Sequence, residues 1–224
     1  MKLNAQSKLL VIMPHPDDEV VFASGFINRC TQNGINVRIV TLTRGEKSSH
    51  RYGLQDGDDL GSIRENELDS ANIILGVASN EVYNIPDCEV SRNIPQVKSL
   101  IKKEINTFKP THIITYEPNG VYGHPDHIAT SEIVSEMRVA EVLLYVTATQ
   151  NFKPSQGAQA LSLNKSIKPT RATHVIYLTL KESFLKYKAI KAHRSQFPLD
   201  LLNFNYLVKL LRKGIMTKEY FIVR

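Results

Sequence analysis

Several features that would place this chain outside the ordinary globular proteins are missing from its sequence. Its 224 residues contain no apolar run near the roughly 20 residues that a membrane-spanning helix needs, so we expect no integral membrane segment. The first residues lead directly into a strand-like run without a cleavage-site pattern, and we expect no signal peptide. Two cysteines, Cys30 and Cys88, have no motif spacing, which favours reduced thiols and a cytoplasmic location.

Motifs of two other function classes are also absent. Lys and Arg outnumber Asp and Glu by 28 to 22, and the net charge of +6 suits either an anionic ligand or a solvated basic surface. The basic segments 181–194 and 208–218 lack nucleic-acid-binding motifs, so we expect no nucleic-acid partner. No G-x-G-x-x-G turn follows a predicted strand. A Rossmann-like nucleotide-binding module and a non-catalytic basic binding protein stay open as alternatives to an enzyme.

Short apolar runs alternate along the chain with segments of helical spacing, which predicts an α/β protein. Strands are predicted at 8–13, 35–42, 81–85, 111–116, 141–148 and 174–180, with an edge strand at 219–223. Helices are predicted at 19–32, 63–75, 95–108, 127–138, 181–193 and 200–213, and long polar connections at 44–61 and 150–172. We expect a single domain over residues 1–224, with a Rossmann-like, mostly parallel sheet, helices on both faces and an active site at the carboxyl ends of the strands.

Two polar clusters lie where such a sheet binds its ligands, each directly after a predicted strand. Residues 14–19 (PHPDDE) place a histidine and three carboxylates in one turn. One Asp is enough to cap a helix, whereas adjacent carboxylates repel each other unless a cation lies between them. Residues 123–127 (GHPDH) add two further histidines. Two histidines and one carboxylate, with one position left open for water, form a catalytic zinc arrangement.

These clusters resemble the signature of the PIG-L/LmbE family of zinc-dependent deacetylases. The signature consists of His-Pro-Asp-Asp-Glu after a strand and a later Gly-His-Pro-Asp-His, present here at 15–19 and 123–127. Supporting matches occur at 43–46 (TRGE), at Arg64 with Glu67 and at His193 with Gln196, so that the resemblance covers about residues 8–197. The resemblance implies hydrolysis of the N-acetyl group of a small N-acetylglucosamine conjugate. It leaves open the group attached to the sugar, an anionic one included, and a homo-oligomeric state.

The resemblance also implies a metal centre with an adjacent base. It assigns one Zn²⁺ per chain, with Fe²⁺ as the alternative, to His15, Asp18 and His127. Asp17 is then the general base for a metal-activated water, because a carboxylate outside the metal's ligand set must accept the proton of that water.

Further residues receive roles around the substrate. By the same resemblance His124 stabilises the oxyanion, Asp126 orients or tunes His124, and Tyr122 polarises the substrate carbonyl. Arg64 and Glu46 are expected to bind substrate, with Arg64 and the 44–61 loop setting affinity more than rate.

Structural roles compete with these functional ones at several positions. Glu19 suits a helix cap, Arg64 suits a surface pair with Glu67, and Glu46 suits the ordering of its own loop. The remaining histidines are expected to be structural or to support the site from behind: His50, His112, His174 and His193.

Overall fold

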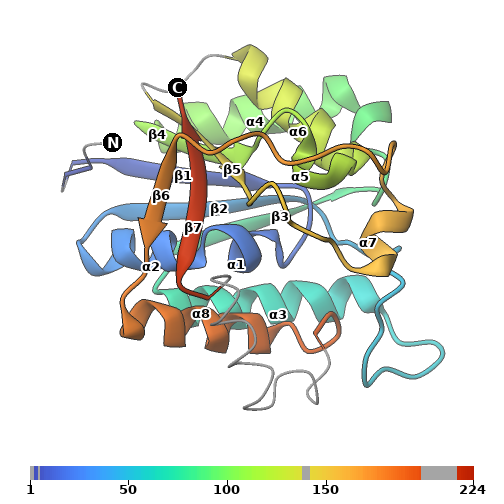
Figure 1. Ribbon diagram of the computed structural model, residues 1–224. Helices are drawn as coiled ribbons and strands as arrows, with labels where there is room; N and C mark the ends of the chain where they lie inside the picture. Colours follow the sequence, from blue (N-terminus) through green and yellow to red (C-terminus); the bar gives the residue numbers. More distant parts are fainter. Residues whose placement is uncertain (1–2, 5, 138–141, 198–215) are drawn as a thin grey trace.

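A computed structural model of the chain describes residues 3–4, 6–137, 142–197 and 216–224, and its centre is a seven-stranded sheet (Figure 1). The strands are β1 (Lys8–Met13), β2 (Asn36–Thr43), β3 (Ser79–Ile85), β4 (His112–Tyr116), β5 (Val142–Thr147), β6 (His174–Tyr177) and β7 (Lys218–Val223). The helices are α1 (Asp18–Phe22), α2 (Ser24–Gln32), α3 (Leu60–Leu75), α4 (Ile94–Phe108), α5 (Gly120–Gly123), α6 (Pro125–Met137), α7 (Gln156–Ala160) and α8 (Leu180–Ala192), with a 3-10 turn at Val90–Arg92.

The strand order β3-β2-β1-β4-β5-β7-β6 confirms the predicted mostly parallel sheet. Strands β3, β2, β1, β4 and β5 pair in parallel, whereas β7 is antiparallel to both of its neighbours. The prediction of an edge strand at 219–223 is therefore wrong, because β7 lies between β5 and β6. Its inner residues are buried, whereas β6 is mostly exposed, but a short apolar run carries no information about which strands flank it.

Both faces of the sheet are covered by helices, as predicted. Helices α1, α2, α3 and α8 lie on one face and α4 and α6 on the other (Figure 1). A hydrophobic core lies on each face of the sheet, and alternate residues of β1 pack into them. Leu9 and Val11 pack into one core, Leu10 and Ile12 into the other, and all four are fully buried. The run KLLVIM is thus apolar throughout because both of its faces are covered.

The predicted helix 19–32 is two helices that meet at Ala23, where φ is −139°. The backbone N–H groups of Gly25 and Phe26 donate to the carboxylate of Glu219 on β7, at 2.9 and 2.8 Å. A carboxylate at the start of α2 satisfies N–H groups that have no partner within the helix and suits the helix dipole. Since Glu219 is 193 residues from Phe26 along the chain, the local helical spacing gives no sign of this break.

The boundaries of the other elements differ less from the predicted ones. Helix α3 begins at Leu60 instead of 63 because the Asp59 carboxylate accepts the N–H of Ser62 at 3.2 Å and caps the helix. The predicted connection 150–172 contains the short helix α7, and the predicted helix 200–213 lies outside the described residues. In the described part of the chain, no helix is long and apolar enough to cross a bilayer.

The ion pair that holds the α1–α2 break gives a test of stability. Lys186 Nζ donates to Glu219 at 2.8 Å and to the Val21 carbonyl at 2.9 Å, and both charged side chains are about 1% exposed. In Lys186→Met the carboxylate of Glu219 loses its counter-charge in the core. We expect the free energy of unfolding, measured by chemical denaturation, to fall by about 3–5 kcal/mol. The exposed Lys188→Met is the control, and an equal loss in both variants would contradict this role.

Candidate active site

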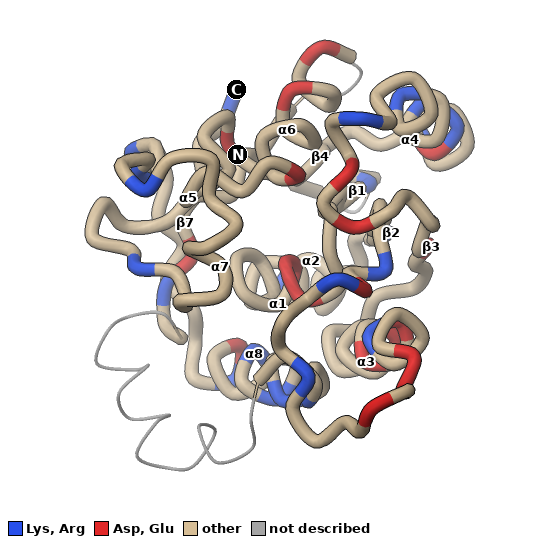
Figure 2. The backbone as a smooth tube through the Cα atoms, turned by 90° about the vertical axis from the view of Figure 1, so that its right-hand side faces the viewer, with Lys and Arg blue, Asp and Glu red and all other residues tan. Residues whose placement is uncertain are grey.

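The two polar clusters meet at one cavity of about 290 Å³, at the ends of β1 and β4. His15, Asp17 and Asp18 line it from the turn after β1, and His124 and His127 from the α5–α6 corner. Figure 2 views the molecule from this edge of the sheet, with the backbone of α5 and α7 on the left and that of β2 and α3 on the right. The cavity therefore lies where ligands bind in open α/β sheets.

Three side chains converge in this cavity with donor atoms suited to a metal ion. His15 Nδ1 lies 3.3 Å from one carboxylate oxygen of Asp18, and His127 Nε2 lies 3.6 Å from the other. Ligand atoms of the three residues all lie within 4.8 Å of one another. Tyr116, the last residue of β4, donates its hydroxyl proton to Asp18 and stacks on His127 with ring centroids 3.8 Å apart. The trio has the two imidazoles and one carboxylate of a catalytic zinc site.

The outer nitrogen of each of these histidines also has a partner. His15 Nε2 lies 3.2 Å from Asp87 and 3.3 Å from Asp126, and His127 Nδ1 lies 3.2 Å from the Gly120 carbonyl. An outer N–H that donates to an oxygen fixes the ring and leaves the inner nitrogen unprotonated. The residues present therefore fit a divalent metal of the zinc type.

The charges of the side chains at the site also favour a metal ion. Although burial opposes its ionisation, His127 and His15 hold the pKa of Asp18 well below its usual range. Burial lowers the pKa of His127 to about 4, so its imidazole is neutral and able to bind a metal near pH 7. Although burial opposes it, Asp126, Asp18 and Asp87 raise the pKa of His15 well above its usual value, so without an ion this imidazole carries the positive charge that the gathered carboxylates favour, and a metal would replace its inner proton.

Asp17 lies beside this trio in a strained backbone conformation. Its φ of 113° is in the left-handed region, and Glu19 accepts its N–H at 3.1 Å. The Asp17 carboxylate lines the cavity and forms an ion pair with Arg64 at 3.1 Å. Burial raises the pKa of Asp17 to about 6 even though Arg64 acts in the opposite direction. Glu19 in turn contacts His193 at 3.2 Å, so its carboxylate joins the backbone of this turn to His193, whereas no side chain caps α1.

Arg64 lines the cavity and holds Asp17 in place, while its contact with substrate stays a prediction. Its guanidinium is buried, donates to the carbonyls of Gly45 (2.7 Å) and Pro16, and pairs with Asp17. Its two terminal nitrogens thus bind the two loops that carry the site, whereas Nε has no hydrogen-bond partner. The alternative pair with Glu67 is absent, because the Glu67 carboxylate accepts the N–H and hydroxyl of Ser195.

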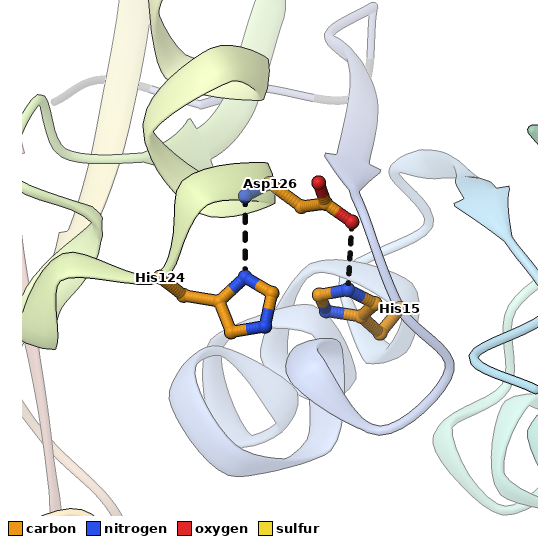
Figure 3. Close-up of side chains that lie close together, drawn as sticks. All are labelled: His15, His124 and Asp126. Atoms are coloured by element: carbon orange, nitrogen blue, oxygen red, sulfur yellow. Dashed lines mark hydrogen bonds and ion pairs between the residues drawn. The ribbon is translucent and has the colours of Figure 1, made fainter. Parts of the chain in front are cut away.

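His124 is oriented by the backbone of Asp126. The Asp126 N–H donates to His124 Nδ1 at 3.2 Å, while the Asp126 carboxylate faces His15 (Figure 3). Burial, together with the nearby His127 and His15, lowers the pKa of His124 to about 2. A neutral ring that accepts at Nδ1 carries its proton on Nε2, which gives the donor an oxyanion requires. The carboxylate of Asp126 also accepts the N–H groups of Cys88 (2.8 Å) and Val90 (3.1 Å).

The two remaining predicted residues occupy different places. Tyr122 lines the cavity, with its ring centroid 5.2 Å from that of His127, and burial raises the pKa of its hydroxyl. Glu46 is exposed and does not line the cavity; its carboxylate accepts the N–H of Asp87 at 2.9 Å. Its position thus matches the loop-ordering alternative, because its carboxylate supports the backbone at Asp87.

Some residues of the site escaped the sequence reasoning. Asp87 follows β3 at the same sheet edge as the two clusters, which is the signal that could have identified it. His50 lines the cavity, although we expected it to be structural. Gln196 fastens the loop that carries His50: its side chain donates to the His50 carbonyl at 3.1 Å and accepts from Ser48 Oγ at 2.8 Å.

Behind the second cluster, Glu117 holds a strained turn. Its fully buried carboxylate accepts the N–H groups of Asn119 (2.8 Å) and Val121 (3.0 Å), and the N–H and hydroxyl of Thr170 (3.3 and 2.6 Å). Val121 has φ 65° and ψ −52°, a conformation that a β-branched residue rarely adopts. Four donors on one carboxylate compensate both for its burial and for this strain.

This turn carries the carbonyl that orients a metal-site histidine. Gly120 lies between Asn119 and Val121, and its carbonyl is the acceptor for His127 Nδ1. Gly120 has φ 59°, and a Cβ there would lie 2.8 Å from the Cβ of His127, so only glycine permits this approach. Glu117 therefore positions His127 through the backbone of the turn.

The fold and the site together define a hydrolase of the metal-dependent α/β class, built on a mostly parallel sheet with two histidines and an aspartate at its carboxyl edge. Residues 10–138 match the PIG-L family, described as GlcNAc-PI de-N-acetylase. The chain belongs to this family.

Similar proteins are deacetylases by name. The chain is 28% identical over 234 residues to 1D-myo-inositol 2-acetamido-2-deoxy-alpha-D-glucopyranoside deacetylase of Actinosynnema mirum, covering 88% of this chain and 83% of the relative. It is 30% identical over 194 residues to a probable N-acetyl-alpha-D-glucosaminyl L-malate deacetylase 2 of Bacillus anthracis, covering 84% and 81%. The N,N'-diacetylchitobiose deacetylase of Pyrococcus horikoshii has a similar structure, with a TM-score of 0.70, 26% identity and coverage of 97% and 84%.

The Arg64 geometry predicts an effect on rate, in contrast to our expectation from the sequence. In Arg64→Met the Asp17 carboxylate loses its partner and its fixed position. We expect kcat of the deacetylation to fall by about 100-fold with little change in KM, since a displacement of about 1 Å at a reacting group has that effect. The exposed Arg51→Met is the control. A rise in KM with unchanged kcat would restore the substrate-contact role.

The turn held by Glu117 predicts an effect on metal binding. A Gln at 117 keeps the shape but offers one carbonyl oxygen in place of two carboxylate oxygens, so some of the four donors lose their acceptor. We expect Glu117→Gln to weaken zinc affinity about 10- to 100-fold, measured by competition with a chromophoric chelator. Thr170→Val, which removes one donor on the far side of the carboxylate, should change it much less. Unchanged zinc affinity in a folded Glu117→Gln protein would contradict the link to His127.

Proposed function

We propose that this protein is a zinc-dependent deacetylase that hydrolyses the N-acetyl group of a small N-acetylglucosamine-type conjugate. The observation that carries the proposal is the convergence of His15, Asp18 and His127, with the Asp17 carboxylate beside them in the same cavity. Family membership and the names of the similar proteins support the substrate class. The free cysteines, Cys30 and Cys88, support a cytoplasmic location.

In this proposal the metal is held by His15, Asp18 and His127. A zinc ion there supplies a Lewis acid that polarises the amide carbonyl and lowers the pKa of water to around 7. Asp17 takes the proton from the attacking water and passes it to the departing amine, and Arg64 holds its carboxylate for both transfers. Without a metal ion, burial raises the pKa of Asp17 to about 6, and a zinc ion in the trio would lower it again, which would keep the base ionised near neutral pH.

The oxyanion that forms during attack faces two neutral donors. His124 offers Nε2–H, because its Nδ1 accepts the Asp126 N–H, and Tyr122 offers its phenol hydroxyl. Loss of one such donor typically costs about 100- to 1,000-fold in rate. The neighbouring carboxylates of Asp87 and Asp126 leave the turn after β1 unsuited to a pyrophosphate, which disfavours the nucleotide-binding alternative.

Two variants separate the roles of the adjacent aspartates. Asp17→Asn keeps the shape of the side chain and removes the base, so we expect kcat to fall by about 100- to 10,000-fold while zinc content stays near that of the wild type. Asp18→Ala removes a ligand and should lower zinc content as well. Acetate release and elemental analysis of the purified proteins measure the two effects, with reconstitution by Fe²⁺ as a test of the alternative metal. Near-normal turnover of Asp17→Asn would show that another group moves the proton.

A further inference from the structure

The segment between β5 and β6 differs in charge from the rest of the chain. From residue 142 to 180 it contains Lys153, Lys165, Lys168 and Arg171 and no Asp or Glu. The segment carries α7 (Figure 1), and Gly157, Ala158 and Leu161 from it line the active-site cavity. Among the described residues these four cations form no ion pair with a carboxylate, so they produce a local positive potential.

The three lysines of this segment line a second cavity of about 730 Å³. Gln159 and Ser162 contribute uncharged polar groups, and among the described residues of its lining there is no Asp or Glu. A cavity of this composition attracts anions and offers hydrogen-bond donors to them.

The second cavity adjoins the active site. Tyr122 lines both cavities, and α7 separates them: Gly157 and Ala158 face the active site, while Gln159 faces the lysine-lined cavity. A ligand with its amide near His127 can therefore extend past Tyr122 toward the lysines. The second cavity is placed to receive the part of a conjugate that lies beyond the amino sugar.

The lysine-bearing loop is also fastened to the catalytic turn. Thr170 donates its hydroxyl and N–H to Glu117, and Asn119 Nδ2 donates to the Lys168 carbonyl at 3.2 Å. Gln150 donates its side-chain amide to the Pro169 carbonyl. These contacts fix the backbone of the cationic loop relative to Tyr122, so the positive charges have a defined place beside the reacting centre.

We propose that this cavity is a subsite for an anionic group, a carboxylate or a phosphate, on the aglycone of the substrate. The proposal rests on the proposed deacetylase function, and it selects anionic conjugates from the broader class of amino-sugar conjugates. Lys165 and Lys168 bind the anion as flexible point charges, and Lys153 faces it from the other end of the segment.

A set of matched substrates tests the subsite. The probes are the butyl glycoside of N-acetylglucosamine and the same glycoside ending in a carboxylate or in a phosphate. For Lys165→Ala/Lys168→Ala we expect kcat/KM on the two anionic probes to fall about tenfold, mainly through KM, which corresponds to about 1.4 kcal/mol. Kinetics on the neutral butyl glycoside should stay within about twofold of the wild type, since exposed charges elsewhere contribute little. A preference for one anionic probe identifies the headgroup.

A charge-matched control and a binding measurement make the outcome decisive. Lys102→Ala/Lys103→Ala removes the same net charge from exposed positions on α4, and an equal loss on the anionic probes in this variant would overturn the subsite.

Calorimetric titration of the metal-free protein with the three probes measures affinity without turnover. If no probe is deacetylated but the anionic probes still bind about tenfold more weakly to the Lys165/Lys168 variant, the subsite stands and the deacetylase function fails. Equal affinity of wild type and variant for all probes would overturn the subsite alone.

Discussion

The guanidinium of Arg64 joins the two loops on which the rest of the site depends. It reaches from α3 to the carbonyl of Pro16 after β1 and to that of Gly45 after β2, and it pairs with the carboxylate of Asp17. A buried Arg needs partners for its charge, and here both terminal nitrogens find them in groups whose placement the proposed chemistry requires. The strained backbone of Asp17 persists because Arg64 and Glu19 hold it from two directions.

The histidines of the metal trio are likewise held in place by neighbouring groups. His15 is held by Asp126 and Asp87, and His127 by the Gly120 carbonyl, which is itself fixed through the turn on Glu117. Asp126 contributes twice, with its N–H on His124 and its carboxylate on His15, so the oxyanion donor and a metal ligand share one support. Such buried polar networks are costly when half satisfied, and this one leaves few of its members without a partner.

Which residues lie together could be predicted from the sequence better than the details of the fold around them. The trio His15, Asp18 and His127 could be predicted because motif and strand position both place it at one sheet edge. The break at Ala23 and the internal position of β7 could not, since both depend on Glu219 and on strand pairings between distant segments. The protein contacts of Arg64 and Glu46 could not be predicted for a related reason: a charged residue in a loop motif gives no indication which backbone groups of its own protein it will contact.

The position of the metal is central, because the proposed roles of Asp17, His124 and Arg64 all depend on it. The described residues contain two other groups able to hold an ion, His15 with His124 and Asp126, and Asp87 with Cys88 and Asp126. In the trio, by contrast, both histidines have their outer nitrogens occupied and their inner nitrogens free for the ion.

A crystal structure of the protein loaded with one equivalent of zinc, with the ion located by anomalous scattering, decides among the three groups. The account predicts an ion about 2.0–2.2 Å from His15 Nδ1, Asp18 and His127 Nε2, with Asp17 outside the ligand set. An ion bound by Asp87, Cys88 and Asp126, or by His124 in place of His127, would contradict it.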